Sequence, residues 1–380
     1  MSLAAFASLA ACSDDDPQPN SSTSSTSSSS STSSSSSGGP DASDEPEPIE
    51  AEANKWTWVP FADSTCANGS PTGLGINKGT SNRVVIYLEG GGACWNDATC
   101  KIGQLASNID GFDETKFNGR VAQMPGSHLD RATEGNPYKD ASLVYIPYCT
   151  GDVHSGDKEA DYGTPALKHF GRRNIAAFLK RLVPTFKDAE RITLTGSSAG
   201  GFGAAISYGR VAEAFSGKRV DLVDDSGPPF PADKMVHYNA AWSPAWDLEG
   251  AFPADCEGCA ADPVKLLPYY FTKYPSSRFA LLSYDEDQTI RNFFKFPDTM
   301  PGTEFKSTLG TVTSDTFDGS TNGRYFVLAG TGHTMLFKMD PPGNNETGTP
   351  LPPVTGEGGV TLAQFLTAMD TDATWNGVKP

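Results

Sequence analysis

The chain has 380 residues, of which 37% are hydrophobic and 10% aromatic, and its formal net charge is −17. This composition supplies enough apolar side chains for a packed core, and the length suits one large α/β domain. The negative charge argues against a nucleic-acid partner, because phosphate binding needs clustered Lys and Arg.

The first residues indicate export. Residues 1–11 are small and mostly apolar, and Leu9-Ala10-Ala11-Cys12 resembles the site at which bacterial lipoproteins are cleaved and lipidated. We therefore expect residues 1–12 to be a lipoprotein signal with Cys12 lipidated, so that a bacterial cell holds the protein on its surface or secretes it. An unmodified apolar N-terminus is the alternative, because no Lys or Arg precedes the short apolar run. No other segment is long and apolar enough to cross a membrane.

Residues 13–54 have the composition of a tether. They contain a Ser/Thr tract over residues 21–37 and an acidic, Pro-containing stretch, and they have no Lys or Arg. Too few apolar side chains are present to offset the entropy that folding costs. We expect a disordered linker over residues 13–54 and one catalytic domain over residues 55–380.

Short apolar runs in the remainder of the chain predict buried strands. They are Val84–Leu88, Leu143–Ile146, Ile192–Thr195, Val220–Val223, Phe279–Ser283 and Tyr325–Ala329. Nearly continuous apolar runs are typical of parallel strands covered on both faces. Helices are expected over Leu167–Leu182, from Ser198 onward and over Leu362–Met369. This alternation predicts an α/β fold with a doubly wound, mostly parallel sheet and helices on both faces.

The cysteines suggest disulfides. Six remain when Cys12 is set aside, and an even number in an exported chain favours three bonds. Cys256 and Cys259 form a Cys-x-x-Cys motif, but no second motif or nearby His completes a zinc site, and no helix start follows as in thioredoxin. We expect these two cysteines to close a tight loop, and we expect no metal.

The run from Gly196 to Gly200, Gly-Ser-Ser-Ala-Gly, follows a predicted strand and precedes a predicted helix. Gly-x-Ser-x-Gly in this setting is the nucleophile elbow of α/β-hydrolases, in which a strained turn exposes the serine. Only Ser198 has glycine at both −2 and +2, so Ser198 rather than Ser197 is the predicted nucleophile. A turn of small residues without catalytic function is the alternative.

Three glycines, Gly90-Gly91-Gly92, follow the first predicted strand. Lipases and esterases carry a glycine loop at this position, because residues without side chains let backbone N–H groups reach the substrate oxygen. The sequence therefore predicts an oxyanion hole here, with a plain glycine turn as the alternative.

Chain order identifies the base among five histidines. In this fold the serine precedes the acid and the acid precedes the histidine, which excludes His128, His154 and His169. His333 lies on a glycine-flanked loop after the last predicted strand and is the predicted base. His237 follows no strand, and we expect it on the surface or in a lid.

The acid of a triad orients the histidine and is expected at the end of a strand. The triplet Asp285-Glu286-Asp287 follows the fifth predicted strand, and Asp285 is nearest to the strand end. Asp285 is therefore the predicted acid. The pair Asp224-Asp225 is the rival, because some hydrolases take the acid from an earlier strand; a helix cap or solvated loop is the alternative for either site.

Together these motifs resemble the pectin acetylesterase/Notum family of serine esterases. The matching stretches are LEGGGACW (88–95), NPY (136–138), YIPYCTGDVHSG (145–156), GSSAGG (196–201), DDSGPPF (224–230), YDEDQT (284–289) and GTGHT (330–334). The resemblance implies an α/β-hydrolase-like fold with Ser198 as nucleophile, Asp285 as acid and His333 as base.

The resemblance also implies further roles. The oxyanion donors would be Gly90, Gly91 and Ala199, and the disulfides Cys66–Cys149 and Cys94–Cys100. Asp225 would lie in the wall of the site rather than act as the acid, and we expect Trp95, Asp152 and Asp225 to bind substrate.

The sequence departs from the family in two places near the expected pocket. Family members carry an aromatic residue before the loop cysteine, where this chain has Gly92-Ala93-Cys94-Trp95. Residues 231–268 have their own Trp-rich sequence. Aromatic residues in and after this region would contact sugar rings or pack the core or a lid; they are Trp242, Trp246, Tyr269, Tyr270 and Phe271.

We expect a monomeric extracellular serine esterase, without cofactor, that removes O-acetyl groups from a pectin-like polysaccharide through an acyl-enzyme. Membrane contact is expected only through the N-terminal lipid. A longer-chain carboxylesterase acting on lipid, lipidated or polyester substrates is the first alternative. A non-catalytic surface glycan-binding lipoprotein is the second, and the intact set of Ser198, Asp285 and His333 argues against it.

Overall fold

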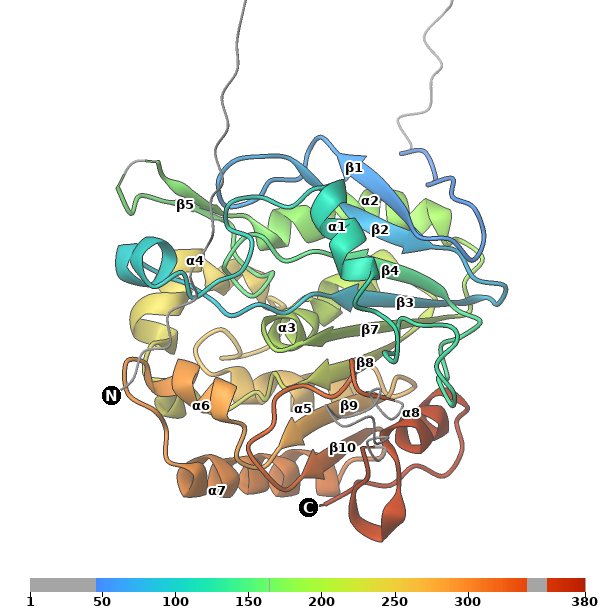
Figure 1. The fold of residues 1–380 in the computed structure, drawn as a ribbon. Helices are drawn as coiled ribbons and strands as arrows, with labels where there is room; N and C mark the ends of the chain where they lie inside the picture. Colours follow the sequence, from blue (N-terminus) through green and yellow to red (C-terminus); the bar gives the residue numbers. More distant parts are fainter. Residues whose placement is uncertain (1–45, 164, 340–353, 380) are drawn as a thin grey trace, which may run out of the picture. The chain divides into compact units, whose positions relative to one another are not determined.

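The computed structural model describes residues 46–163, 165–339 and 354–379 (Figure 1). Eight strands form one sheet in the order β1-β2-β4-β3-β7-β8-β9-β10. Their bounds are β1 (Thr57–Phe61), β2 (Thr72–Asn77), β3 (Arg83–Leu88), β4 (Ser142–Ile146), β7 (Arg191–Ser197), β8 (Arg219–Asp225), β9 (Phe279–Tyr284) and β10 (Gly323–Leu328). The six strands from β4 to β10 in this order are parallel, and β1 and β2 are antiparallel. The predicted mostly parallel sheet and its six predicted strands are confirmed.

Helices cover both faces of this sheet, as predicted (Figure 1). They are α1 (Glu114–Val121), α2 (Gly171–Thr185), α3 (Ala199–Ala214), α4 (Ser243–Trp246), α5 (Leu266–Lys273), α6 (Gln288–Lys295), α7 (Gly302–Val312) and α8 (Leu362–Asp370). Shorter helical turns lie at Ala98–Ile102, Ala232–Lys234, Tyr238–Trp242, Leu248–Ala251, Pro263–Lys265, Thr313–Asp318 and Glu357–Gly359. Successive strand residues point to opposite faces, so Val84 and Ile86 share a core with α2, α3, α5 and α7, while Val85 and Tyr87 share one with α1 and α8.

The helix predicted over Leu167–Leu182 begins later, at Gly171. Its first residues instead form strand β6 (Leu167–His169), which pairs antiparallel with β5 (Lys158–Ala160). The sequence also gave no signal for β2, whose Gly73 and Gly75 disfavour a strand. A Cβ at Gly75 would lie 2.2 Å from the Phe117 ring, so glycine there makes room for α1 against the sheet.

The folded body starts before the predicted boundary at residue 55. Ile49 is 1% exposed, and its N–H donates to the Thr185 hydroxyl at 2.7 Å. The N–H of Asn54 donates to the Lys78 carbonyl at 2.8 Å. One apolar residue in an acidic stretch was too weak a sequence signal to predict this contact. Residues 1–45, with the lipidation predicted at Cys12, lie outside the described residues.

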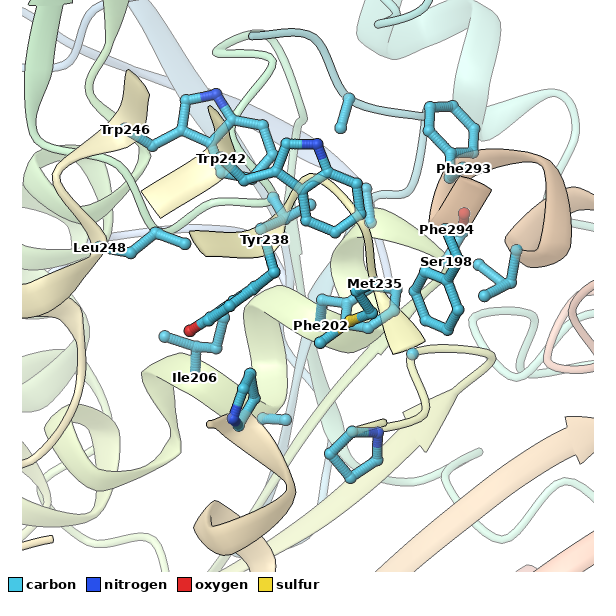
Figure 2. A pocket seen from close by; sticks show the side chains of 18 of the residues that line it. Ser198, Phe202, Ile206, Met235, Tyr238, Trp242, Trp246, Leu248, Phe293 and Phe294 are labelled. Carbon is cyan, nitrogen blue, oxygen red and sulfur yellow. The ribbon is translucent and has the colours of Figure 1, made fainter. Parts of the chain in front are cut away.

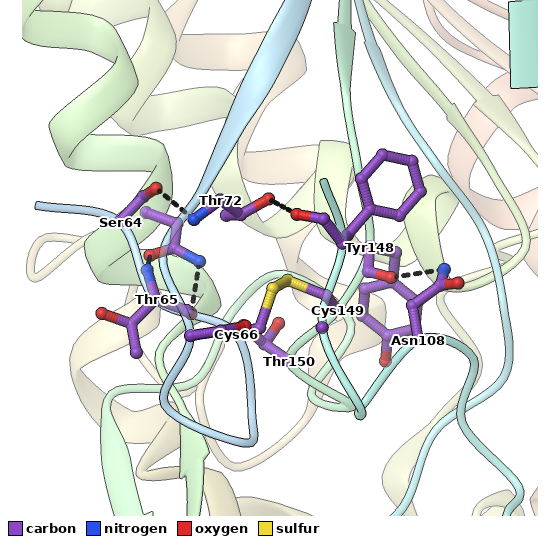
Figure 3. Close-up of a disulfide and its surroundings, with 12 residues drawn as sticks. Ser64, Thr65, Cys66, Thr72, Asn108, Tyr148, Cys149 and Thr150 are labelled. Carbon is purple, nitrogen blue, oxygen red and sulfur yellow. Dashed lines mark hydrogen bonds between the residues drawn. A yellow bond between two sulfur atoms is a disulfide. The ribbon is translucent and has the colours of Figure 1, made fainter. Parts of the chain in front are cut away.

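The three expected disulfides form: Cys66–Cys149, Cys94–Cys100 and Cys256–Cys259. The first joins the chain ahead of β2 to the loop after β4 (Figure 3). Beside it, Asn108 Nδ2 donates to the Tyr148 carbonyl at 3.0 Å, which further holds that loop. Disulfides persist in oxidising compartments, in keeping with export. Among the described residues, no helix is both long and apolar enough to cross a bilayer.

The strand order places the loops after β3 and β7 side by side near the centre of the sheet. Strand β3 lies between β4 and β7, so the chain leaves β3 on one side and returns on the other. The register pairs Leu88 with Gly196. In open α/β sheets, ligands bind outside the carboxyl ends of the strands at such a switch point. The glycine loop after β3 and the predicted nucleophile after β7 therefore meet at this position.

Candidate active site

Ser198 occupies a strained turn between β7 and α3. Its φ of 59° and ψ of −122° are sparsely populated for a residue with a side chain. The turn depends on its glycines, because a Cβ at Gly196 would lie 2.1 Å from the Gly200 carbonyl oxygen, and a Cβ at Gly200 would lie 2.0 Å from the Leu88 carbonyl oxygen. Ser198 is 8% exposed, and its side chain reaches two cavities. This is the geometry of a nucleophile elbow.

His333 follows β10 and lines the same cavity as Ser198. Its Nδ1 lies 2.8 Å from Oδ2 of Asp287. Asp287 is fully buried, and its Oδ1 accepts a hydrogen bond from the Ile290 N–H at 3.1 Å, so the carboxylate also caps α6. A carboxylate fixed in this way keeps the proton on Nδ1 and leaves Nε2 free to act as a base.

The prediction that Asp285 orients His333 is wrong in this structure. Asp285 Oδ1 accepts a hydrogen bond from the Gly330 N–H at 2.8 Å, and its Oδ2 pairs with Lys306 Nζ at 2.6 Å. The chain turns after β9, which sends Asp285 toward Lys306 and Asp287 toward the histidine. The helix-capping position of Asp287 was the one sequence signal that could have drawn attention to it.

Asp225 holds the histidine loop rather than substrate. The N–H groups of Met335 and Leu336 donate to its carboxylate at 2.9–3.0 Å, and the Ser197 hydroxyl donates at 2.8 Å. The Asp225 carbonyl accepts the Ser198 N–H at 2.7 Å. Burial raises the pKa of this carboxyl group. Asp225 therefore joins the elbow to the loop that carries His333, and the residue is 0% exposed, which contradicts the predicted substrate contact.

The structure also removes Trp95 and Asp152 from the substrate-binding set. Trp95 is 4% exposed and packs against His237 and Trp242, with ring centroids 5.0 and 5.6 Å away. Asp152 is 0% exposed and accepts hydrogen bonds from backbone N–H groups of Gly156 and Gly171. Loop residues near them do line the apolar cavity, as Ala93 and Val153 do. The sequence could not show which residues of these loops face the cavity and which face the interior.

The expected oxyanion donors surround Ser198. A Cβ at Gly90 would lie 2.4 Å from the Ser197 carbonyl oxygen and 3.1 Å from Ser198 Cβ, so glycine permits this close passage. Gly91 has a φ of 147°, which also favours glycine. Among the described residues, none accepts a hydrogen bond from the N–H groups of Gly90, Gly91 or Ala199. These donors are free to bind a developing oxyanion.

In the described part of the chain, two cavities of opposite character meet at Ser198. The narrower is apolar and occupies about 750 Å³, its mouth included. Figure 2 shows how its side chains surround a space that extends from Ser198 toward Trp242, Trp246 and Leu248. The remaining apolar wall includes Phe202, Ile206, Met235, Tyr238, Phe293 and Phe294. The aromatic region 231–268 thus forms much of this pocket.

The second cavity is wider and polar, with about 920 Å³ that includes its opening to solvent. His333, Thr334, Gln123 and Arg120 line it together with the glycine loop. Arg120 Nε pairs with Oε1 of Glu89 at 2.6 Å. An ester whose carbonyl carbon lies at Ser198 would therefore have an apolar space on one side and a polar, open space on the other.

Some residues of the aromatic cluster expected from the sequence line the apolar pocket, and others pack in the core. Trp242 and Trp246 stack at 5.9 Å in the apolar pocket wall. Tyr270 is buried against Tyr208 at 4.7 Å, and Phe271 packs on Phe279 at 5.1 Å. Of the five aromatic residues of the expected cluster, only Trp242 and Trp246 line this pocket.

Acid should destabilise the fold through His128, which lies beneath the His333 loop. Its Nδ1 is 3.1 Å from the Leu336 carbonyl, and burial lowers the pKa of His128 to about 4. Between about pH 6.5 and 4 the unfolded chain binds a proton that the folded protein does not, so the free energy of unfolding falls as pH falls. We expect the wild type to lose up to about 1.4 kcal/mol per pH unit more than His128→Gln.

Urea unfolding of both proteins across this pH range measures the difference. Identical slopes for the wild type and His128→Gln would contradict the assignment.

Comparisons with known proteins find a matching family model, related sequences and a similar fold. A family model described as Pectinacetylesterase matches residues 50–297, well over half of the chain. Palmitoleoyl-protein carboxylesterase NOTUM from Drosophila melanogaster is 26% identical over 306 residues, which cover 73% of this chain and 44% of that protein. Pectin acetylesterase 4 from Arabidopsis thaliana is 31% identical over 149 residues, which cover 37% of this chain and 35% of that protein. The chain thus matches less than half the length of these curated relatives.

The crystal structure of the Wnt deacylase Notum from Drosophila has a similar fold. It covers 87% of this chain and 97% of its own, with a TM-score of 0.59 and 20% sequence identity. At this identity the likeness establishes the α/β-hydrolase-like architecture alone. Because the family model matches well over half of the chain, the chain belongs to the pectinacetylesterase family.

Proposed function

We propose that this protein is a serine esterase that hydrolyses esters of apolar acyl groups longer than acetyl. The observation that carries the proposal is the apolar cavity beside Ser198. Ile206 in its wall lies eight residues beyond Ser198 on α3, roughly 12 Å along a helix axis. An acetyl group would occupy only the mouth of such a cavity, whereas a longer chain would bury its methylene groups along it.

In the proposed reaction, Ser198 Oγ attacks the ester carbonyl carbon while His333 Nε2 takes the hydroxyl proton. The carbonyl π bond opens, and its electron pair moves to the oxygen, which the N–H groups of Gly90, Gly91 and Ala199 would hold. Asp287 keeps the Nδ1 proton in place and stabilises the imidazolium that forms.

The tetrahedral intermediate then expels the alcohol, which takes its proton from His333. Water attacks the resulting acyl-serine with His333 again as the base, and the carboxylic acid and free Ser198 are released. Every proton that leaves Ser198 or water is returned to a leaving oxygen, so the cycle needs no cofactor.

The alcohol would lie in the polar cavity, which suits a carrier rich in hydroxyl or amide groups. Arg120 and Gln123 there offer donors and an acceptor to such a carrier. This cavity and the family match also favour a second candidate function, removal of O-acetyl groups from a pectin-like polysaccharide. The printed names of the relatives include both a palmitoleoyl-protein carboxylesterase and a pectin acetylesterase.

A series of p-nitrophenyl esters separates the two candidates. For a longer-chain esterase, kcat/KM should rise from acetate to octanoate by up to about fourfold per buried methylene. An enzyme that prefers acetate and releases acetate from acetylated pectin would instead support the polysaccharide acetylesterase.

Blocking the apolar cavity should change chain preference without harming the chemistry. Ile206→Trp fills the space about two helical turns from Ser198, so kcat/KM for octanoate is expected to fall by at least about tenfold while acetate hydrolysis changes little. Ile206→Val leaves the space open and is the matched control. Equal losses for acetate and octanoate would show that the acyl chain does not enter this cavity.

A further inference from the structure

The carbonyl group of Glu89, which precedes the glycine loop, is held by a buried histidine. His154 Nε2 lies 2.8 Å from the Glu89 carbonyl oxygen. A carbonyl oxygen only accepts hydrogen bonds, so the Nε2 of His154 carries the proton and donates it. His154 is 3% exposed and follows the loop that the Cys66–Cys149 disulfide pins (Figure 3).

The same peptide unit contains the Gly90 N–H, one of the expected oxyanion donors. A trans peptide is planar, and its C=O and N–H point in opposite directions. A hydrogen bond that fixes the Glu89 carbonyl therefore also fixes the direction of the Gly90 N–H. Because hydrogen bonds in a chain polarise one another, it also makes that N–H a better donor.

Glu89 is anchored at its other polar groups as well. Its N–H donates to the Ile146 carbonyl at 3.0 Å, and its Oε2 accepts the Tyr148 N–H at 2.9 Å. Its Oε1 pairs with Arg120. The residue ahead of the glycine loop thus has little freedom to rotate, and His154 supplies the contact that sets its carbonyl direction.

The backbone at Val153 and His154 adopts strained dihedral angles. Val153 has a φ of 49° and His154 a φ of 59°, a region that side-chain-bearing residues rarely adopt, and β-branched ones least of all. The Tyr148 hydroxyl accepts the Val153 N–H at 2.9 Å, and the Asp152 carbonyl accepts the Ser155 N–H at 3.0 Å. Strain of this kind persists only where the surroundings hold it, and it concentrates at functional sites.

Glycines in two helices leave room for this loop to pack closely against them. A Cβ at Gly171, the first residue of α2, would lie 2.5 Å from the His154 Cα. A Cβ at Gly203, on the helix that begins after Ser198, would lie 2.9 Å from the His154 Cβ. The Asp152 carboxylate ties the loop to the start of α2 by accepting the Gly171 N–H at 2.8 Å. The loop is therefore built into the frame that also carries the nucleophile.

The His154 imidazole ring is suited to act as a hydrogen-bond donor in a fixed position. Burial lowers the pKa of His154, so its imidazole is neutral at ordinary pH, and its ring packs on the Tyr148 ring at 4.8 Å. His154 does not line either cavity at Ser198, so it has no direct contact with substrate there.

We propose that His154 is a positioning residue for the oxyanion hole: it donates Nε2–H to the Glu89 carbonyl and thereby directs the Gly90 N–H at the substrate oxygen. This proposal rests on the proposed esterase function. It predicts that loss of the donor harms the transition state more than substrate binding.

Three substitutions separate donor chemistry from packing. His154→Phe keeps a planar ring without a donor, His154→Gln places an amide N–H near the Nε2 position, and His154→Asn places one too short to reach. With p-nitrophenyl butyrate, His154→Phe and His154→Asn are expected to lower kcat by about 10- to 100-fold with KM nearly unchanged. His154→Gln should recover most of the wild-type kcat.

Affinity for a trifluoromethyl ketone, which forms a tetrahedral adduct with the serine, should fall by the same factor as kcat/KM. Thermal melting identifies variants that do not fold. If His154→Phe does not fold, the comparison of His154→Gln with His154→Asn still shows whether the hydrogen-bond donor is needed. Wild-type kcat in His154→Phe, or equal losses in Gln and Asn variants, would overturn the inference. A wild type that hydrolyses no ester would overturn the proposed function, and the inference with it.

Discussion

Replacing Ser198 with alanine is expected to lower kcat for p-nitrophenyl butyrate by about 10⁶-fold, the scale seen when a serine nucleophile is removed. The elbow places this hydroxyl where the apolar and polar cavities meet, which is the position of the proposed nucleophile. Labelling by a fluorophosphonate, which reacts with activated serines, should disappear in parallel. The fold should persist, because the change removes one oxygen from the side chain and leaves the backbone turn unaltered.

Ser197→Ala is the matched control, since it removes the adjacent hydroxyl from the same turn. The Ser197 hydroxyl donates to Asp225 at 2.8 Å, and Ser197 lines the polar cavity but not the apolar one. Losing it should cost about 1–3 kcal/mol of stability, because a buried acceptor loses a partner. Activity should stay within about tenfold of the wild type. If Ser197→Ala abolished labelling and Ser198→Ala did not, the nucleophile would have to be reassigned.

Asp287→Asn is expected to lower kcat by about 10⁴-fold while leaving KM nearly unchanged, because an amide can hold His333 in the wrong tautomer. The 2.8 Å contact between Asp287 Oδ2 and His333 Nδ1 is the basis of this expectation. The pH profile of kcat/KM should also change, since the variant no longer stabilises the imidazolium. Steady-state kinetics with p-nitrophenyl butyrate across pH provide the measurement.

Asp285→Asn provides the matched control two residues earlier. Asp285 accepts the Gly330 N–H and pairs with Lys306, so an amide there should weaken the loop after β10 and lower kcat by no more than about tenfold. A larger loss in Asp285→Asn than in Asp287→Asn would return the acid role to Asp285. Because both substitutions remove one negative charge from the same turn, a difference between them cannot arise from net charge.

The parts of the site that lie within one continuous motif could be predicted from sequence. The elbow needs Gly196 and Gly200 because a side chain at either position would clash with neighbouring backbone. Both glycines belong to one short motif, so the sequence alone could show this requirement. The glycine loop and the strand before it are likewise local. Chain order then separated His333 from the histidines that precede Ser198, since topology constrains order along the chain.

The choice among neighbouring carboxylates could not be made in this way. Asp285 and Asp287 both follow β9, and only the path of the turn decides which one meets a histidine 46 positions later in the chain. Asp152 and Trp95 lie in motif stretches beside loops that reach the site, yet both face the protein interior. Side-chain direction in a loop depends on backbone dihedrals that distant contacts impose, as at His154.

The sequence alone thus predicted the six parallel strands of the sheet, the elbow at Ser198, the place of His333 and the disulfide-forming cysteines, because each follows from local pattern or chain order. Only the tertiary structure decided which carboxylate contacts His333, the anchoring roles of Asp152 and Asp225, and the shape of the apolar cavity. These features arise where segments far apart in the chain meet, and their energies depend on burial and contact geometry that no single segment contains.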